Sequence, residues 1–263
     1  MATSEKGKDA LPTKKQPKAR IHLTMQGKGG IGKSFVASML AQYMGEYGKH
    51  YVAYDTDPIQ QTFKKYKALN VTHLPLSMNG KKDQVNSRAF DKLMEEILTI
   101  EKDTDFIVDI GSGTYLPLIS YMVENAVTDI ITEAGHELLF HAVITGGPAQ
   151  TDTEEGLQKL FKYFPQTQSI IWMNQFFGPY KVNNDPSDFE KTPLYTDNEE
   201  KVFSVIVIPE WRDDTYGDDI QRMMVDALTF DECVECEDYH IMSKHRIGRV
   251  KAAMMHSMGL ARL

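Results

Sequence analysis

The sequence has little of what marks a secreted, membrane-spanning or broadly DNA-binding protein. Only two cysteines occur in 263 residues, which excludes a disulfide framework. There is no run of 18 apolar residues, and the N-terminus lacks the apolar core of a secretory signal. The formal net charge is −8, so the chain as a whole has no excess of positive charge for nucleic acid. We therefore expect a soluble, cytoplasmic protein.

Positive charge is concentrated at the two ends of the chain. Residues 1–20 carry six basic and two acidic side chains, and residues 241–263 carry five basic and no acidic ones. Residues 1–19 contain few apolar side chains, which predicts a disordered basic leader. Residues 20–263 are expected to form a single domain. Direct contact with DNA would have to use the basic ends or go through a partner.

The last segment, residues 241–263, predicts a basic amphipathic helix. Apolar side chains such as Ile247, Val250 and Met254 recur at near-helical spacing, with lysine and arginine between them. Such a helix can lie on an anionic surface, which would place the protein peripherally at the inner membrane. It can equally be the last helix covering a sheet, or a docking surface for a partner.

From residue 20 onward, apolar runs alternate with helical patterns, as in βαβ units. Strands are expected at 21–26, 50–55, 105–110, 138–144, 169–174 and 203–208, with a weaker extended segment near 72–76. Helices are expected at 33–47, 58–68, 86–99, 115–126, 154–164, 216–229 and 240–258. The longest loop is expected at 178–200, which is rich in proline, asparagine and aspartate. The fold class is therefore α/β, a doubly wound and mainly parallel sheet with helices on both faces.

Residues 27–34 read GKGGIGKS, which is the phosphate-loop pattern G-x-x-x-x-G-K-[ST]. An apolar run precedes it and a helical run follows, which is the context that the motif requires. Glycines let successive N–H groups turn toward phosphate oxygens, while Lys33 reaches the phosphates and the Ser34 hydroxyl ligates Mg²⁺. The predicted nucleotide-binding residues here are Gly29, Gly30, Ile31, Gly32, Lys33, Ser34 and Phe35.

Two further strand ends carry carboxylates. Asp57 follows the second strand, where it can orient the attacking water or support Mg²⁺, although it also suits the N-cap of a helix that starts at Pro58. Asp109 ends an apolar run and resembles a Walker B acid, which holds Mg²⁺. The predicted metal-binding residues are therefore Ser34, Asp57 and Asp109. Gly111 and Gly113 then form a turn suited to a switch beside the γ-phosphate.

The base-binding residues are predicted from the last two strand ends. A guanine-reading motif would continue with lysine after Asn174, but Gln175 and Phe176 stand there instead. Asn174 can hydrogen-bond an adenine edge, and the segment from Pro209 to Trp211 can wall the base. ATP is therefore preferred over GTP.

These motifs together resemble the deviant Walker A sequence of the ParA/MinD superfamily of P-loop ATPases. Lys28 precedes the loop glycines, and Asp57, Asp109, Asn174 and Pro209 follow in the order that the superfamily uses. Within it, the chain is similar to plasmid conjugation and stability proteins of the TraL and StbB type. One departure is the turn after Asp109, where the superfamily usually has a proline.

The resemblance implies a homodimer that sandwiches ATP and Mg²⁺. Lys28 would cross to the partner's phosphates, and Asp57 would be the catalytic carboxylate beside Lys33. A crossing lysine neutralises charge on the transferred phosphoryl group, as an arginine finger does. The implied function is an ATP-hydrolysing switch in plasmid segregation or conjugative DNA transfer, with a free or DNA-bound protein of that system as partner.

Two other functions and one other site stay open. The same fold could serve a small-molecule kinase or ligase, or a scaffold that binds nucleotide without turnover. Cys233 and Cys236, with His240 and His245 downstream, could form a zinc site if residues 233–245 are one helix, but buried thiols are the simpler interpretation.

Overall fold

The computed structural model describes residues 17–74, 76, 87–211 and 213–263. Of the predicted leader, residues 1–16 lie outside the described residues. Over the described part, no helix is both long and apolar enough to cross a bilayer.

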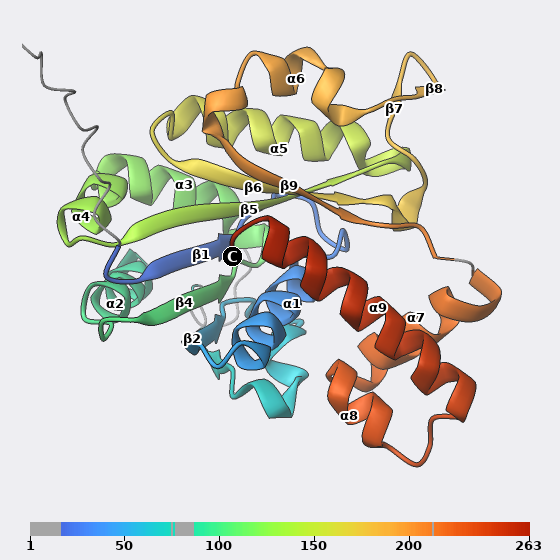
Figure 1. Cartoon of the computed structure of the whole chain (residues 1–263). Coiled ribbons are helices and arrows are strands. Elements are labelled where there is room, and N and C mark those ends of the chain that lie inside the picture. The colour runs from blue at the N-terminus through green and yellow to red at the C-terminus, as the bar shows by residue number, and fades with distance from the viewer. Residues whose placement is uncertain (1–16, 75, 77–86, 212) are drawn as a thin grey trace, which may run out of the picture.

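One sheet of seven parallel strands lies at the centre of the described chain (Figure 1). The strands are β1 (Arg20–Thr24), β2 (His50–Asp55), β3 (Thr72–His73), β4 (Thr104–Asp109), β5 (Glu137–Thr145), β6 (Gln168–Asn174) and β9 (Val202–Ile208). Their order is β3-β2-β4-β1-β5-β6-β9, which confirms the predicted doubly wound sheet. The chain leaves β1 toward β2 and later returns to the other side at β5. The carboxyl end of β1 therefore lies at the switch point, where such sheets bind ligands.

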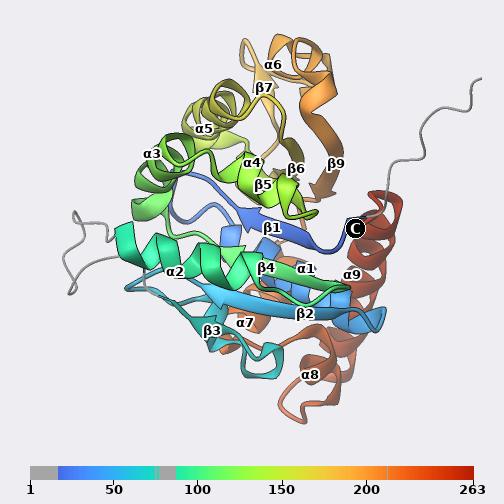
Figure 2. The same cartoon turned by 90° about the vertical axis from the view of Figure 1, so that its left-hand side faces the viewer.

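Helices cover both faces of the sheet, each over its own apolar core (Figures 1 and 2). One face carries α1 (Lys33–Glu46), α7 (Asp218–Asp226), α8 (Phe230–Glu235) and α9 (Ile241–Leu260). The other carries α2 (Ser87–Leu98), α3 (Tyr115–Glu124), α4 (Val127–Glu133) and α5 (Gln150–Tyr163), with α6 (Pro193–Thr196) at its rim. Since α1 is buried around most of its circumference, it holds the end of the phosphate loop rigidly.

Two predicted segments differ from the structure. The helix expected at 58–68 was wrong, because only 3₁₀ turns form there, at Phe63–Lys65 and Lys67–Leu69. The carboxylates of Asp55 and Asp57 accept four backbone N–H bonds from residues 57–64, and such local bonds compete with a helix. The loop expected at 178–200 instead contains a short hairpin, β7 (Lys181–Val182) with β8 (Asp185–Pro186), followed by α6.

The C-terminal helix, α9, packs over the same face of the sheet as α1. Ile247, Val250 and Met254 are buried in the same core as α1, whereas Ile241, Met242 and Leu260 near the helix ends are exposed. Its Lys251 ammonium lies 2.7 Å from carboxylate oxygens of both Glu46 and Asp231. The apolar stripe that would enter a membrane is therefore already used by the fold, which favours the sheet-covering interpretation of α9.

Candidate nucleotide site

The phosphate loop connects β1 to α1 and is shaped by two left-handed glycines. Gly30 has a φ of 73° and Gly32 a φ of 104°, a region that side chains with a Cβ rarely adopt. Gly32 is also the N-cap residue of α1, and a Cβ added to it would lie 3.0 Å from Nδ2 of Asn174. The Asn174 amide donates to the Ile31 carbonyl at 2.9 Å, so the end of β6 fixes this turn directly.

Lys33 and Ser34 begin α1 and contact two different groups. The buried Lys33 ammonium donates to the Lys28 carbonyl at 2.9 Å. Burial lowers the pKa of Lys33, and the charges of Asp109 and Asp57 partly oppose this. The Ser34 hydroxyl donates to Oδ2 of Asp109 at 2.5 Å. The hydroxyl and carboxylate predicted to bind a metal are therefore already in contact.

Asp109 is a fully buried carboxylate at the end of β4. Burial raises its pKa to about 6, although hydrogen bonds from Ser34 and Thr24 act in the opposite direction. Its ionised form is therefore disfavoured in the folded protein unless a cation or further donor compensates. A hard divalent cation with oxygen ligands would supply that compensation.

We expect Asp109→Asn to stabilise the nucleotide-free protein at pH 7.5 by about 1–3 kcal/mol. The folded pKa is about 6 and the unfolded value is 3.8, so the charge costs stability above pH 6. This cost disappears as the pH falls through 6 toward 3.8, and the advantage of the variant should shrink with it. Urea unfolding in EDTA at several pH values measures the effect, with the exposed Asp103→Asn as control. Equal stability of Asp109→Asn and wild type at pH 7.5 would contradict the expectation.

Asp57 holds a turn with one oxygen and keeps the other free for the site. Its Oδ1 accepts the N–H groups of Ile59 and Gln60, both at 2.8 Å. Its Oδ2 faces Gly111, where an added Cβ would lie 3.2 Å away. Asp57 therefore caps a turn and not the predicted helix, and its second oxygen lies beside the turn after Asp109.

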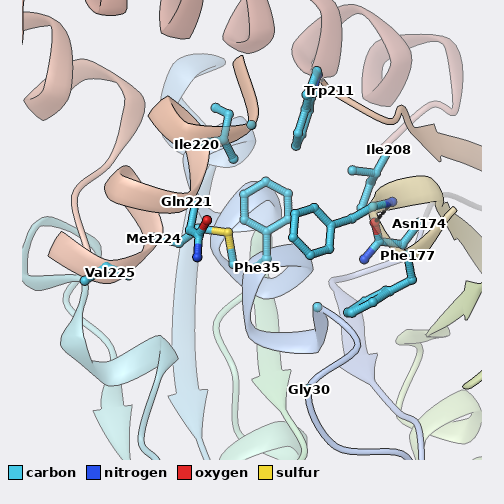
Figure 3. Close-up of a pocket in the computed structure, with 13 residues that line it drawn as sticks. Gly30, Phe35, Asn174, Phe177, Ile208, Trp211, Ile220, Gln221, Met224 and Val225 are labelled. Atoms are coloured by element: carbon cyan, nitrogen blue, oxygen red, sulfur yellow. Dashed lines mark hydrogen bonds between the residues drawn. The ribbon is translucent and has the colours of Figure 1, made fainter. Parts of the chain in front are cut away.

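Two adjoining cavities, which together we call the cleft, lie around the loop and share part of their lining. A cavity of about 310 Å³ is lined by polar groups, including Lys33, Ser34, Asp57 and Asp109. A second cavity, of about 350 Å³, is mostly apolar (Figure 3). Gly30, Gly32, Phe35 and Met224 line both cavities. The cleft suits a ligand with a charged, phosphate-like end and a flat apolar end.

Most predicted site residues line this cleft, but Lys28, Ile31 and Pro209 do not. Pro209 lines neither cavity, whereas Trp211, two residues later, lines the apolar one beside Ile208 and packs edge-on against Phe35. Sequence reasoning missed the wall that α7 provides, which comprises Ile220, Gln221, Met224 and Val225. No local motif marks that wall.

Lys28 points away from the loop to a second helix. Its ammonium lies 2.6 Å from Oδ2 of Asp152, which is in the first turn of α5. Both side chains are about half exposed, so the pair contributes little to stability. The lysine is therefore held by a contact that another charged group can replace.

A buried glutamine ties the start of the loop to the same helix. Gln26 donates to the Thr153 carbonyl at 2.9 Å and accepts the Gly27 N–H at 3.0 Å. A Cβ added to Gly156 would lie 1.7 Å from Oε1 of Gln26, so no other residue fits there without moving it.

We expect Gly156→Ala to destabilise the protein by about 2–4 kcal/mol, because the new methyl displaces Gln26 from its hydrogen bonds. Helix propensity alone predicts the opposite effect, because alanine in place of glycine inside a helix stabilises a protein by about 0.5–1 kcal/mol. Gly248→Ala, inside α9 with no atom within 4 Å of the added Cβ, should show that gain and serves as control. Chemical unfolding of both variants measures the two changes in the free energy of unfolding. A Gly156→Ala variant as stable as the wild type would exclude the close contact with Gln26.

The cysteine pair does not form the helical zinc arrangement considered from the sequence. α8 ends at Glu235 and α9 begins at Ile241, so residues 233–245 are not one helix. Among the described residues, no group of three or more potential ligands is placed to hold a metal ion. Burial raises the pKa of Cys233 to about 11, as expected for an unreactive thiol in the core.

The parallel sheet, the glycine-rich loop and the buried lysine at a helix start define a P-loop NTPase fold. The MinD protein of Pyrococcus horikoshii, solved with Mg-ADP, has a similar structure, with a TM-score of 0.52 at 16% identity over 92% of this chain and 98% of that one.

Two curated relatives from Escherichia coli, both described as Protein TraL, are 39% identical to this chain. The match to the first spans 92% of this chain and 98% of that relative. The match to the second spans 90% of this chain and 95% of that relative. The family model described as Zeta toxin matches residues 2–146. The chain therefore belongs to the TraL family and, through residues 2–146, to the P-loop family described as Zeta toxin.

Proposed function

We propose that this protein is an ATP-driven dimeric switch that serves plasmid stability or conjugative DNA transfer. The observation that carries the proposal is the pair of adjoining cavities, of which one is lined by Lys33 and the carboxylates, the other is mostly apolar, and both are lined by Phe35. A nucleoside triphosphate has the same division between a charged chain and a flat base. Membership of the TraL family, together with the resemblance to plasmid proteins, supports the cellular role.

The residues present fit ATP with Mg²⁺. Ser34 and Asp109 provide adjoining oxygen ligands, and Asp57 adds a carboxylate on the same cavity. Bound Mg²⁺ would neutralise phosphate charge and so remove the cost of ionising Asp109. The structurally similar MinD protein was solved with Mg-ADP, which agrees with this choice of ligand.

In the proposed mechanism each residue has a distinct role. Lys33 leaves the Lys28 carbonyl for the phosphates, and Asp57 Oδ2 orients the attacking water. Lys28 exchanges Asp152 for the phosphates bound by the partner subunit, so hydrolysis requires the dimer. The turn at Gly111 and Ser112 lines the phosphate cavity beside Asp57, where it can respond to the γ-phosphate.

One experiment tests the proposal against its alternatives. The molecular mass and ATP turnover of the wild type are followed together without nucleotide, with ADP and with ATP, using Lys33→Ala as the variant that should not respond. We expect dimers and phosphate release with ATP alone. Binding without turnover would indicate a nucleotide-dependent scaffold, and transfer of the γ-phosphate from labelled ATP to a small molecule would indicate a kinase. A mass that ATP does not change would rule out the dimeric switch.

A further inference from the structure

The two cavities of the cleft set the direction in which a nucleotide lies. Trp211 lines only the apolar cavity, Phe35 lines both, and Lys33 lines only the polar one. A nucleotide with its base beside Phe35 therefore extends its phosphates into the polar cavity, toward Lys33. The proposed mechanism also fixes the last phosphate, because Asp57 can orient an attacking water only if that phosphate lies beside it.

The turn after β4 borders this end of the polar cavity. Oδ2 of Asp57 faces Gly111, where an added Cβ would lie 3.2 Å away. Ser112 follows directly and begins a 3₁₀ turn, Ser112–Thr114. Its Oγ lies 3.4 Å from the place that a Cβ on Gly29 would take, so the Ser112 hydroxyl faces the phosphate loop. A phosphate beside Asp57 is therefore also within reach of this hydroxyl.

The Ser112 hydroxyl is not committed to another group. The side chain is partly buried, and it makes no hydrogen bond within the described part of the chain. By contrast, the Ser34 hydroxyl in the same cavity already donates to Asp109. Ionised carboxylates such as Asp57 and Asp109 can only accept hydrogen bonds, so they offer nothing to a phosphate oxygen. The serine hydroxyl can donate one.

We infer that the Ser112 hydroxyl donates a hydrogen bond to the third phosphate and lets each subunit distinguish ATP from ADP, an inference that rests on the proposed nucleotide-binding function. ADP lacks the phosphate that lies beside Asp57 and Ser112, so it cannot use this contact. A hydrogen bond to a charged acceptor is stronger than one between neutral groups. The switch thus responds to the third phosphate before the two subunits meet.

Fluorescence titration with N-methylanthraniloyl derivatives of ADP and of AMP-PNP, a slowly hydrolysed analogue of ATP, tests this contact. The full-length protein is kept dilute and in Mg²⁺, so that binding to the monomer is measured. We expect Ser112→Ala to weaken AMP-PNP binding by about tenfold. ADP affinity should stay within about twofold of wild type, which also shows that the variant is folded. Because alanine keeps the backbone N–H groups of the turn, the loss measures the hydroxyl alone.

Ser120→Ala makes the same substitution at an exposed position of α3 and should leave both affinities unchanged. If the wild type binds both nucleotides and Ser112→Ala weakens both alike or neither, the inference is overturned while nucleotide binding stands. A wild type that binds ADP but not AMP-PNP would also overturn it. If the wild type binds neither nucleotide, the proposed function falls together with the inference.

Discussion

Asp57→Asn should lower ATP turnover by about 10²–10⁴-fold, the range that loss of a general base produces. The side chain keeps an oxygen for the Ile59 and Gln60 N–H groups, so the turn survives and only the carboxylate chemistry is lost. Because the product state is no longer reached, ATP should hold the variant in dimers. Phosphate release and molecular mass, measured on the same sample, report both effects.

Asp57→Ala provides the comparison, since it removes the turn contacts as well as the charge. We expect the alanine variant to match the asparagine variant in turnover but to be less stable by about 1–2 kcal/mol, the usual cost of a lost cap. ADP affinity should stay within a few-fold of wild type in both variants. Full turnover in Asp57→Asn would show that the residue serves only as a cap.

The sequence allowed the phosphate loop, Asp57 and Asp109 to be predicted together because each belongs to a local pattern. A glycine-rich loop after an apolar strand, and acids at the ends of two more apolar strands, converge when the strands are parallel. Segment 58–68 has a helical pattern too, but there the helix was wrong. Its backbone donors are taken by Asp55 and Asp57, and a periodic apolar pattern does not reveal such competition.

Contacts between distant segments could not be predicted in the same way. Gln26 and Gly156 are separated by 130 residues, and only the folded chain reveals that no side chain fits between them. The α7 wall has an ordinary amphipathic pattern, and its place at the cleft follows from how the chain returns after β9. The ion pair of Lys28 with Asp152 is likewise long-range, so the sequence identified the lysine but not what holds it.

Lys28→Ala should reduce ATP turnover by about 10³-fold or more, as loss of a cross-subunit cation does in related chemistry. Nucleotide affinity of the monomer should stay within about twofold, because Lys33 contacts the Lys28 carbonyl, which the substitution retains. Stability should also be unchanged within about 0.5 kcal/mol, since the side chain is half exposed. The split between lost turnover and retained monomer binding distinguishes a group that acts across the dimer from one that binds nucleotide in its own subunit.

Asp152→Asn removes the other half of the ion pair and leaves Lys28 in place. If the pair only holds the lysine in the monomer, this variant should dimerise at the same or up to a few-fold lower ATP concentration and keep wild-type turnover, because an exposed pair contributes at most about 1 kcal/mol. If instead Lys28 acts through Asp152, both variants should lose activity alike. Retained turnover in Lys28→Ala would exclude the crossing lysine, whereas loss of turnover in Asp152→Asn would place the functional contact within one subunit.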